Sequence, residues 1–523
     1  MLLPAVDSPP RGVSVASSTS TPAPTGGWNA RDNIANMKPD DALILDNWFP
    51  ETDSLTLRKG FTMHSQRGFT NNAPVETLMA YNSATGGKLF AAVNGLGIYD
   101  CTLFSQVTTP DYSAITGARF QYVNFGTTGG QFIVAVNGVD DPINYNGSAW
   151  STSPAITGSG LTASDFVNIN VFKKRIFLIP KNTLEFWYLP VNAIGGTAVK
   201  FDLSSECKLG GYLMAMGTWT RDGGDGLDDL AVFITSQGEL LLYQGTDPGD
   251  ANAWQLIGNF RIGPPIGRRC FQKIGAELVI ISKDGFLPLS RVLGSGRVGK
   301  EKISDKIVKA VTKAGALYGD NFGWQAILYP ARNMGIFNVP VQEAATTHQY
   351  VVNTATGAWC RFTGINTCCW EIFNDELYFG ALAGTNRLVM KFDNGFSDFG
   401  ANRRGDVKPA FSYFGHRGRL KKFNNVRPVM YTDGDLSIAM ETNVDFEDDA
   451  PDNVVASNGG TGSLWDVAEW DVSLWGFDER IVKDWQGATK SGHAGTVRMQ
   501  IATRERDVSL FAFDWLYELG GYI

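Results

Sequence analysis

The chain has 523 residues, of which 19% are charged and 12% are aromatic, with 59 glycines and a formal net charge of −8. The low charge and high aromatic content exclude a disordered or coiled-coil protein, and the acidic balance excludes a globally basic surface for nucleic acid. No stretch approaches the ~18 apolar residues of a membrane span, and the first residues lack the basic start of a secretory signal.

Residues 1–27 form an arm rich in proline, serine, threonine and glycine. Such a composition cannot bury enough apolar surface to order by itself. Two interpretations are open: the arm has no fixed structure, or it becomes ordered against a partner.

From about residue 74 the chain repeats one pattern, in which an apolar strand enters a tight turn and a second strand leaves it. Asn-Gly and Asp-Gly pairs supply the positive φ angles that short hairpin turns need. Successive turns are about 43 to 55 residues apart, a period typical of β-propellers. The turns lie at Asn94-Gly95, Asn137-Gly138, Lys181-Asn182, Gln237-Gly238 and Asp284-Gly285, then near 333–335 and Gly384.

These repeats predict an all-β fold, a divergent β-propeller of about six or seven blades over residues 28–404. A pair of β-sandwiches is the competing architecture. One segment departs from strand periodicity: apolar residues at Ile303, Ile307, Val311 and Ala314 predict one short inserted amphipathic helix, with Ser304 as its N-cap. After residue 404 the composition changes, and we expect a second, C-terminal β domain over 405–523.

The most suggestive motif for a ligand is residues 294–301, GSGRVGKE, which matches a dinucleotide-binding G-x-G-x-x-G pattern and nearly matches a phosphate-binding loop. Glu301 replaces the hydroxyl residue that would hold Mg²⁺, and the expected cap Ser304 places the glycines away from the helix terminus. We interpret the motif as a connecting loop and expect no cofactor.

Other candidate sites are equally weak. The loop at 221–229 gathers four carboxylates but lacks the spacing of a calcium loop, and we expect a solvated turn. The six cysteines and four histidines show no metal-ligand spacing, so we expect reduced, mostly buried thiols and no metal site. Propellers can carry the two carboxylates of a glycosidase, but nothing in the sequence selects a pair. We therefore expect no catalytic residues.

Two charge blocks follow the propeller region. Residues 403–427 carry eight basic side chains and one acid, and residues 433–452 carry eight acids and no base. Three interpretations are open: two solvated faces, contacts between the blocks across a ring of subunits, or basic contacts to DNA phosphates. The tentative interface or DNA-facing residues are Arg403, Arg404, Arg417, Arg419, Lys421, Lys422, Asp445, Glu447, Asp448 and Asp449.

Residues 27–50, GWNARDNIANMKPDDALILDNWFP, together with LRKGF at 57–61, resemble the opening of virion proteins of short-tailed (podovirus) phages. The family is the tail nozzle or tail-tubular-protein-B-like group. Residues 415–428, 444–446 and the closing YELGGY at 517–522 are similar to that group as well. The matching motifs are structural, and the long arm before residue 26 departs from the family pattern.

The resemblance implies a non-enzymatic structural protein of the short tail, assembled in the host cytoplasm. It implies a propeller-based homo-hexameric ring below the portal and the head-to-tail adaptor ring, with tail fibre or spike proteins attached laterally. DNA would be retained by the ring and ejected through its lumen, with transient non-specific contacts. An acidic chain suits such a conduit, because its lumen would not trap phosphate. A tail-associated glycan-binding or glycan-cleaving β-propeller is the alternative, and a generic host-side propeller scaffold is a third reading.

Overall fold

The computed structural model describes residues 16–71, 73–84, 86–222, 227–295, 303–458 and 480–522. The chain divides into two compact units: unit 1 contains residues 1–57 and 402–523, and unit 2 contains residues 58–401. Residues 28–57, which we assigned to the propeller by their position in the chain, therefore belong with the C-terminal β domain. The other predicted boundary, at residue 404, differs from the observed one by only three residues.

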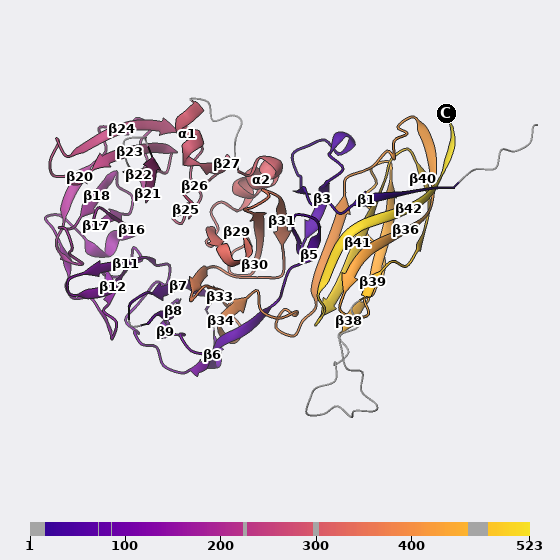
Figure 1. Cartoon of the computed structure of the whole chain (residues 1–523). Coiled ribbons are helices and arrows are strands. Elements are labelled where there is room, and N and C mark those ends of the chain that lie inside the picture. The colour runs from indigo at the N-terminus through magenta and orange to yellow at the C-terminus, as the bar shows by residue number, and fades with distance from the viewer. Residues whose placement is uncertain are drawn as a thin grey trace, which may run out of the picture. The chain divides into compact units, whose positions relative to one another are not determined.

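The described strands of unit 2 form a ring of seven blades, antiparallel apart from one parallel pair in the seventh blade, which confirms the all-β, multi-blade fold (Figure 1). The first three blades are β7 (Val75–Tyr81), β8 (Lys88–Val93) and β9 (Gly97–Asp100); β11 (Gln121–Thr127), β12 (Gly130–Val136), β13 (Ile143–Tyr145) and β14 (Trp150–Ser151); and β16 (Phe166–Phe172), β17 (Arg175–Pro180), β18 (Glu185–Tyr188) and β20 (Val199–Asp202). The next three are β21 (Leu213–Asp222), β22 (Leu227–Thr235), β23 (Glu239–Gly245) and β24 (Trp254–Arg261); β25 (Phe271–Ile274), β26 (Glu277–Ser282) and β27 (Gly285–Pro288); and β28 (Gln325–Tyr329), β29 (Met334–Gln342), β30 (Thr346–Asn353) and β31 (Trp359–Phe362).

The seventh blade closes the ring with strands from both ends of unit 2. It contains β32 (Trp370–Phe373), β33 (Glu376–Gly380), β34 (Thr385–Phe392), β6 (Phe61–Asn71) and β10 (Ser105–Val107). The N-terminal strand β6 pairs antiparallel with β34, in a register that joins Phe61 to Phe392. Because each end of the ring supplies strands to one sheet, neither end is left as an open sheet edge.

The predicted hairpin turns are present. In the first five blades each one joins the second and third strands, with positive φ at Gly95, Gly138, Asn182, Gly238 and Gly285. Gly384 has the same place in the seventh blade. The turn near residue 333 differs, because Asn333 lies between the first and second strands of the sixth blade.

The predicted helix is present as α2 (Val308–Tyr318), preceded by a 3₁₀ turn, η3 (Asp305–Ile307), and by a second short helix, α1 (Leu289–Ser295). Ser304 precedes η3, but its hydroxyl does not cap the helix. It accepts a hydrogen bond from the backbone N–H of Phe286 at 3.1 Å, because Ser304 is buried beside β27. Three other 3₁₀ turns are η1 (Ile34–Asn36), η2 (Ala163–Asp165) and η4 (Pro330–Arg332), and a two-stranded ribbon joins β15 (Ile156–Thr157) to β19 (Gly196–Thr197).

Unit 1 contains two facing groups of strands. One group is β4 (Trp48–Pro50), β5 (Leu55–Leu57), β42 (Val508–Tyr522), β36 (Arg419–Thr432) and β39 (Arg480–Val482), with β1 (Ala16–Pro22) on β42 and β40 (Gln486–Gly492) on β36. The other is β2 (Gly27–Trp28), β3 (Asp41–Asp46), β35 (Arg403–Pro409), β41 (Gly495–Arg504), β37 (Ile438–Val444) and β38 (Ala456–Asn458). Glycines allow the groups to approach: Gly405 lies against the indole of Trp48, and Gly495 lies against the ring of Phe423.

The described part of the N-terminal arm is ordered against its own chain. Residues 16–22 pair antiparallel with residues 512–518 of β42. The hydroxyl of Thr21 accepts a hydrogen bond from the indole N–H of Trp515 at 3.1 Å, and the backbone N–H of Ala23 donates to Phe511. The serine and threonine residues thus form an edge strand whose partner is the C-terminal strand.

Aromatic packing between the first two blades gives a test of the ring. The Phe90 ring is fully buried and lies 4.8 Å from the ring centre of Tyr145 and 5.1 Å from that of Trp150. Phe90→Ala should lower the free energy of unfolding by about 3–5 kcal/mol, because truncation leaves a cavity in this cluster. Chemical denaturation followed by tryptophan fluorescence measures the change.

Phe104→Ala is the matched control, because Phe104 is 73% exposed. It should alter the free energy of unfolding by less than about 0.5 kcal/mol. Equal losses for the two variants would contradict the packing described.

Candidate functional site

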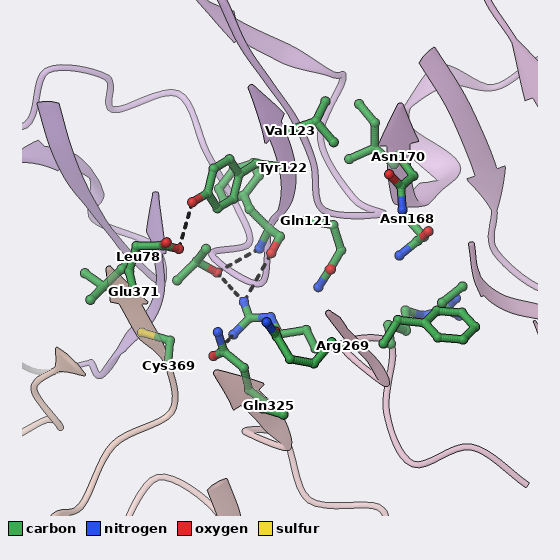
Figure 2. A pocket seen from close by; sticks show the side chains of 18 of the residues that line it. Leu78, Gln121, Tyr122, Val123, Asn168, Asn170, Arg269, Gln325, Cys369 and Glu371 are labelled. Atoms are coloured by element: carbon green, nitrogen blue, oxygen red, sulfur yellow. Dashed lines mark hydrogen bonds between the residues drawn. The ribbon is translucent and has the colours of Figure 1, made fainter. Parts of the chain in front are cut away.

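The first strands of all seven blades surround one cavity of about 240 Å³. It is lined by residues of, or directly before, β7, β11, β16, β21, β25, β28 and β32, so it lies on the axis of the ring (Figure 2). Because the first strand of a blade does not pair with that of the next blade, its backbone polar groups need side-chain partners. Amide side chains supply several of them.

Three pairs of neighbouring blades show this arrangement. Asn124 of β11 donates to the carbonyl oxygen of Ala80 on β7 at 2.8 Å. Asn168 and Asn170 of β16 accept from and donate to the backbone of Met216 on β21 at 3.0 and 2.8 Å. Gln325 of β28 bonds both backbone groups of Trp370 on β32. The amides therefore bridge the inner edges of adjacent blades.

Arg269, directly before β25, crosses the cavity (Figure 2). Its Nη2 donates to Thr77 Oγ1 at 2.7 Å and to the carbonyl oxygens of Glu76 and Phe120 at 3.1 Å. These acceptors belong to the first and second blades, whereas Arg269 belongs to the fifth. Only arginine combines this reach with several donors in a planar fork, so the side chain acts as a strut between opposite blades.

Tyr122 and Glu371 form a half-buried pair beside the strut (Figure 2). The Tyr122 hydroxyl donates to Glu371 Oε2 at 2.7 Å and accepts from the backbone N–H of Ala80 at 3.1 Å. Burial raises the pKa of Glu371 to about 7, although the hydrogen bonds from Tyr122 and Ile372 and the charge of Arg269 favour the carboxylate. This carboxyl group therefore changes charge near neutral pH.

The cavity offers few groups for catalysis. Among its lining residues, Glu371 is the single carboxyl group and there is no histidine. A glycosidase mechanism needs two carboxyl groups across the bond that is cleaved. Burial raises the pKa of the Cys369 thiol, which keeps it protonated and unreactive. The arrangement is suited to structural bridging between the blades.

The described residues contain no cluster of histidine, cysteine or acidic side chains with metal-binding geometry. All six cysteines lie among the described residues, none of them forms a disulfide bond, and five are buried. The glycine-rich motif at 294–301 lies largely outside the described residues, as do positions 223–226 of the acidic loop.

The predicted basic residues divide into buried and exposed groups. Arg403 is buried and donates to the carbonyl oxygen of Arg506. Lys421 is also buried, and its Nζ donates to the carbonyl oxygens of His416, Arg419 and His493 at 2.6, 2.9 and 2.7 Å. These two cations serve the interior of unit 1.

Three predicted basic residues are exposed: Arg404, Arg417 and Lys422. Arg417 stacks over the ring of Tyr413 at 4.8 Å. Arg419 is half-buried and donates through two nitrogens to the carbonyl oxygen of Gly520. The exposed cations are therefore the ones that can meet a partner.

The predicted acidic residues are exposed, yet most already have partners in unit 1. Asp448 pairs with the buried Lys408 at 2.9 Å, and Glu447 and Asp449 both pair with Lys490 at 3.1 Å. Asp445 accepts from the backbone N–H groups of His493 and Ala494. The acidic loop thus meets basic residues of its own chain.

The sequence analysis did not identify Arg269, Glu371 or Tyr122. Each stands alone in the sequence, and the ring brings them together from the fifth, seventh and second blades. A usable signal was the recurrence of amides on the first strands, such as Asn168 and Asn170 on either side of Ile169. This alternation of amides is typical of an inner strand whose side chains hydrogen-bond the backbone of the next blade.

No protein-family model and no curated protein matches the sequence. Among solved structures, the extracellular domain of the putative hybrid two-component system BT3049 from B. thetaiotaomicron is 11% identical, with a TM-score of 0.40 over 74% of this chain and 45% of that one. Chaetomium thermophilum Raptor is 9% identical, with a TM-score of 0.37 over 64% of this chain and 29% of that one. The chain thus spans less than half the length of either.

An exo-β-1,3-galactanase from Phanerochaete chrysosporium, solved with β-1,3-galactotriose, is 9% identical, with a TM-score of 0.28 over 76% of this chain and 95% of that one. Likenesses of this size give no argument about activity. Within the described residues, no helix is long and apolar enough to cross a lipid bilayer.

Glu371 should make stability depend on pH. Its pKa rises from an ordinary 4.5 to about 7 on folding, so between these values the folded chain binds more protons than the unfolded chain. The free energy of unfolding should therefore fall as pH rises from about 4.5 to about 7 and level off above. Glu371→Gln, which stays neutral and can still accept from Tyr122, should lose this dependence.

The measurement is the urea midpoint of both proteins at about pH 5 and about pH 8, where the variant should gain up to a few kcal/mol relative to the parent at the higher pH. Glu376→Gln in the same blade is the control, because this side chain is 42% exposed. A pH dependence that is identical in the parent and in Glu371→Gln would show that Glu371 ionises normally.

Proposed function

We propose that this chain is the nozzle subunit of a short phage tail, a non-enzymatic virion protein that assembles into a homo-hexameric ring. The observation that supports this most is the convergence of the family-like segments in one unit. Residues 27–50, 415–428, 444–446 and 517–522 come from both ends of the chain and lie in unit 1, whereas the fifth segment, 57–61, begins at the last residue of that part of unit 1 and continues into unit 2. Because these segments are far apart in the sequence but belong to one folded unit, their resemblance to the family can reflect one shared domain.

The contacts among these segments are extensive. Trp48 and Phe49 are buried, and the Asn47 side chain donates to the carbonyl oxygen of Arg404 at 2.7 Å. Strand β36 pairs with β42 along residues 419–432, which joins the 415–428 segment to the closing residues. Residues at both termini therefore contribute to one core.

Unit 2 fits a structural role for a separate reason. Its axial cavity is crossed by Arg269 and holds a single carboxyl group, so the two-carboxylate chemistry of a glycan-cleaving enzyme finds no support there. The net charge of −8 suits a ring whose lumen must let DNA pass without trapping it. In this proposal the lumen is formed between subunits and is distinct from the propeller axis.

The proposal includes partners. The ring would bind the head-to-tail adaptor above it and fibre or spike proteins at its sides, in the virion and earlier in the host cytoplasm. The exposed side chains of Arg404, Arg417 and Lys422 would contact a neighbouring subunit or DNA phosphates. The paired acidic loop at 445–449 leaves these cations in excess on that segment.

Negative-stain microscopy and mass photometry of the full chain, alone and with its adaptor ring, test the proposal. We expect sixfold rings with a central hole. A triple variant, Arg404→Glu, Arg417→Glu and Lys422→Glu, should reduce the ring fraction, because it replaces three exposed cations by acids. The reduction should diminish as salt screens the charges.

Lys313→Glu, on the exposed side of α2 in unit 2, is the control and should leave the rings intact. Monomers in every sample would overturn the nozzle assignment. Rings that persist unchanged in the triple variant would overturn the assignment of this basic surface.

A further inference from the structure

A second cavity, of about 570 Å³, opens at one mouth of the propeller axis. Its walls come from the segments that lead into β11, β16, β21, β25 and β28 and from the turns after β12, β22 and β26. It shares Gln121, Arg268 and Arg269 with the axial cavity, so the strut of Arg269 separates the mouth from the deeper space. All of its lining residues belong to unit 2.

The lining of the mouth is strongly cationic. Four basic residues, Arg119, Arg268, Arg269 and Lys283, face a single lining carboxylate, Asp320. Arg119 is already neutralised by Glu76 at 3.0 Å and Glu343 at 2.7 Å. The other three cations carry the excess charge of the mouth.

Arg268 has partners that leave its charge uncompensated. Its Nη1 donates to the carbonyl oxygen of Met214 at 3.2 Å, and its guanidinium stacks over the ring of Tyr212 at 5.8 Å. Among the described residues, no carboxylate lies within ion-pair distance of Arg268 or of the exposed Lys283. A half-buried cation without a counter-ion is costly, and an anion from solution removes that cost.

The rest of the mouth can recognise hydroxyl groups. Amides of Gln121, Gln237 and Asn321 line it together with the hydroxyls of Ser236 and Tyr212. The Phe322 ring is held between the guanidinium groups of Arg119, at 4.2 Å, and Arg269, at 5.2 Å. Polar donors and acceptors around a central cation are suited to a compact polyhydroxylated ligand.

We propose that the mouth of the propeller binds an acidic saccharide, with Arg268 and Lys283 holding its carboxylate and the surrounding amides holding its hydroxyls. The cavity volume is within the ~300–1,000 Å³ range of small-ligand sites. It is a concave hollow rather than an extended stripe, which favours a sugar acid over a nucleic acid backbone. The inference goes beyond the nozzle assignment and does not depend on ring assembly.

Isothermal titration calorimetry of the full chain tests the site, with trigalacturonate, neutral galactotriose, inorganic phosphate and a short DNA duplex as probes. Trigalacturonate should bind, and galactotriose should bind at least about tenfold more weakly, because it lacks the charge-assisted hydrogen bonds. Arg268→Gln should weaken trigalacturonate binding about tenfold or more, and Lys283→Gln should weaken it less, since Lys283 is exposed.

Lys273→Gln is the matched control. Lys273 is exposed and lies at the other end of β25, away from the mouth, so this variant should bind like the parent. Circular dichroism and thermal unfolding show whether Arg268→Gln is folded, and Lys283→Gln provides a surface change that keeps the test valid if it is not.

Four results would overturn the proposal: no binding of trigalacturonate, equal binding of galactotriose, equal affinities in Lys283→Gln and Lys273→Gln, or phosphate binding as tightly as trigalacturonate. The last would mean a site for small anions alone. DNA binding that depends on Arg268, with no binding of trigalacturonate, would assign the mouth to nucleic acid instead. None of these results bears on whether sixfold rings form.

Discussion

Closure of the propeller depends on one ion pair and the strand pairing that it secures. Arg58 and Asp398 are 340 positions apart, at the two ends of unit 2, and they form a bidentate pair with N–O distances of 2.8 and 2.6 Å. The Arg58 side chain is 1% exposed, so the pair lies in a site of low dielectric where its loss would leave an uncompensated charge. Arg58 also donates to the carbonyl oxygens of Lys59 and Thr363. The Arg58–Asp398 ion pair lies directly beside the pairing of β6 with β34 that completes the seventh blade.

The axial cavity follows from this closure. Seven inner strands brought into a ring leave their facing edges without sheet partners, and the chain satisfies them with amides and with Arg269. Such a network is stable only when its members are satisfied together, which explains why the strut has three acceptors on two other blades. Arg268, its neighbour in sequence, lines both the axial cavity and the mouth and has a single carbonyl partner. Arg269 thus bridges the blades across the axis, and Arg268, directly before it in the sequence, leaves a positive charge at the mouth.

Local patterns predicted much of the ring, and the reason is visible in the turns. Asn-Gly and Asp-Gly pairs mark hairpins because they tolerate positive φ, and Gly95, Gly138 and Gly285 adopt it. The closing strand could not be predicted this way, because β6 pairs with residues more than three hundred positions away and carries no local mark of its partner. For the same reason residues 28–57 were assigned to their neighbours in sequence, although β4 and β5 join β42 near the C-terminus. The candidate site could not be predicted because Arg269 and Glu371 are far apart in the sequence and are brought to one cavity only when the ring closes.

The charge blocks show what composition leaves undecided. Opposite charges in adjacent segments suggested contacts between subunits, yet Lys408 of the basic block is bound to Asp448 of the acidic block within the same unit. Lys490, outside both blocks, pairs with Glu441, Glu447 and Asp449. A count of charges along the chain cannot distinguish these internal pairs from free ones, because pairing is decided by which strands lie side by side. Once the internal pairs are removed, the exposed cations of the basic block are Arg404, Arg417 and Lys422, and a partner that recognises them must supply the negative charge.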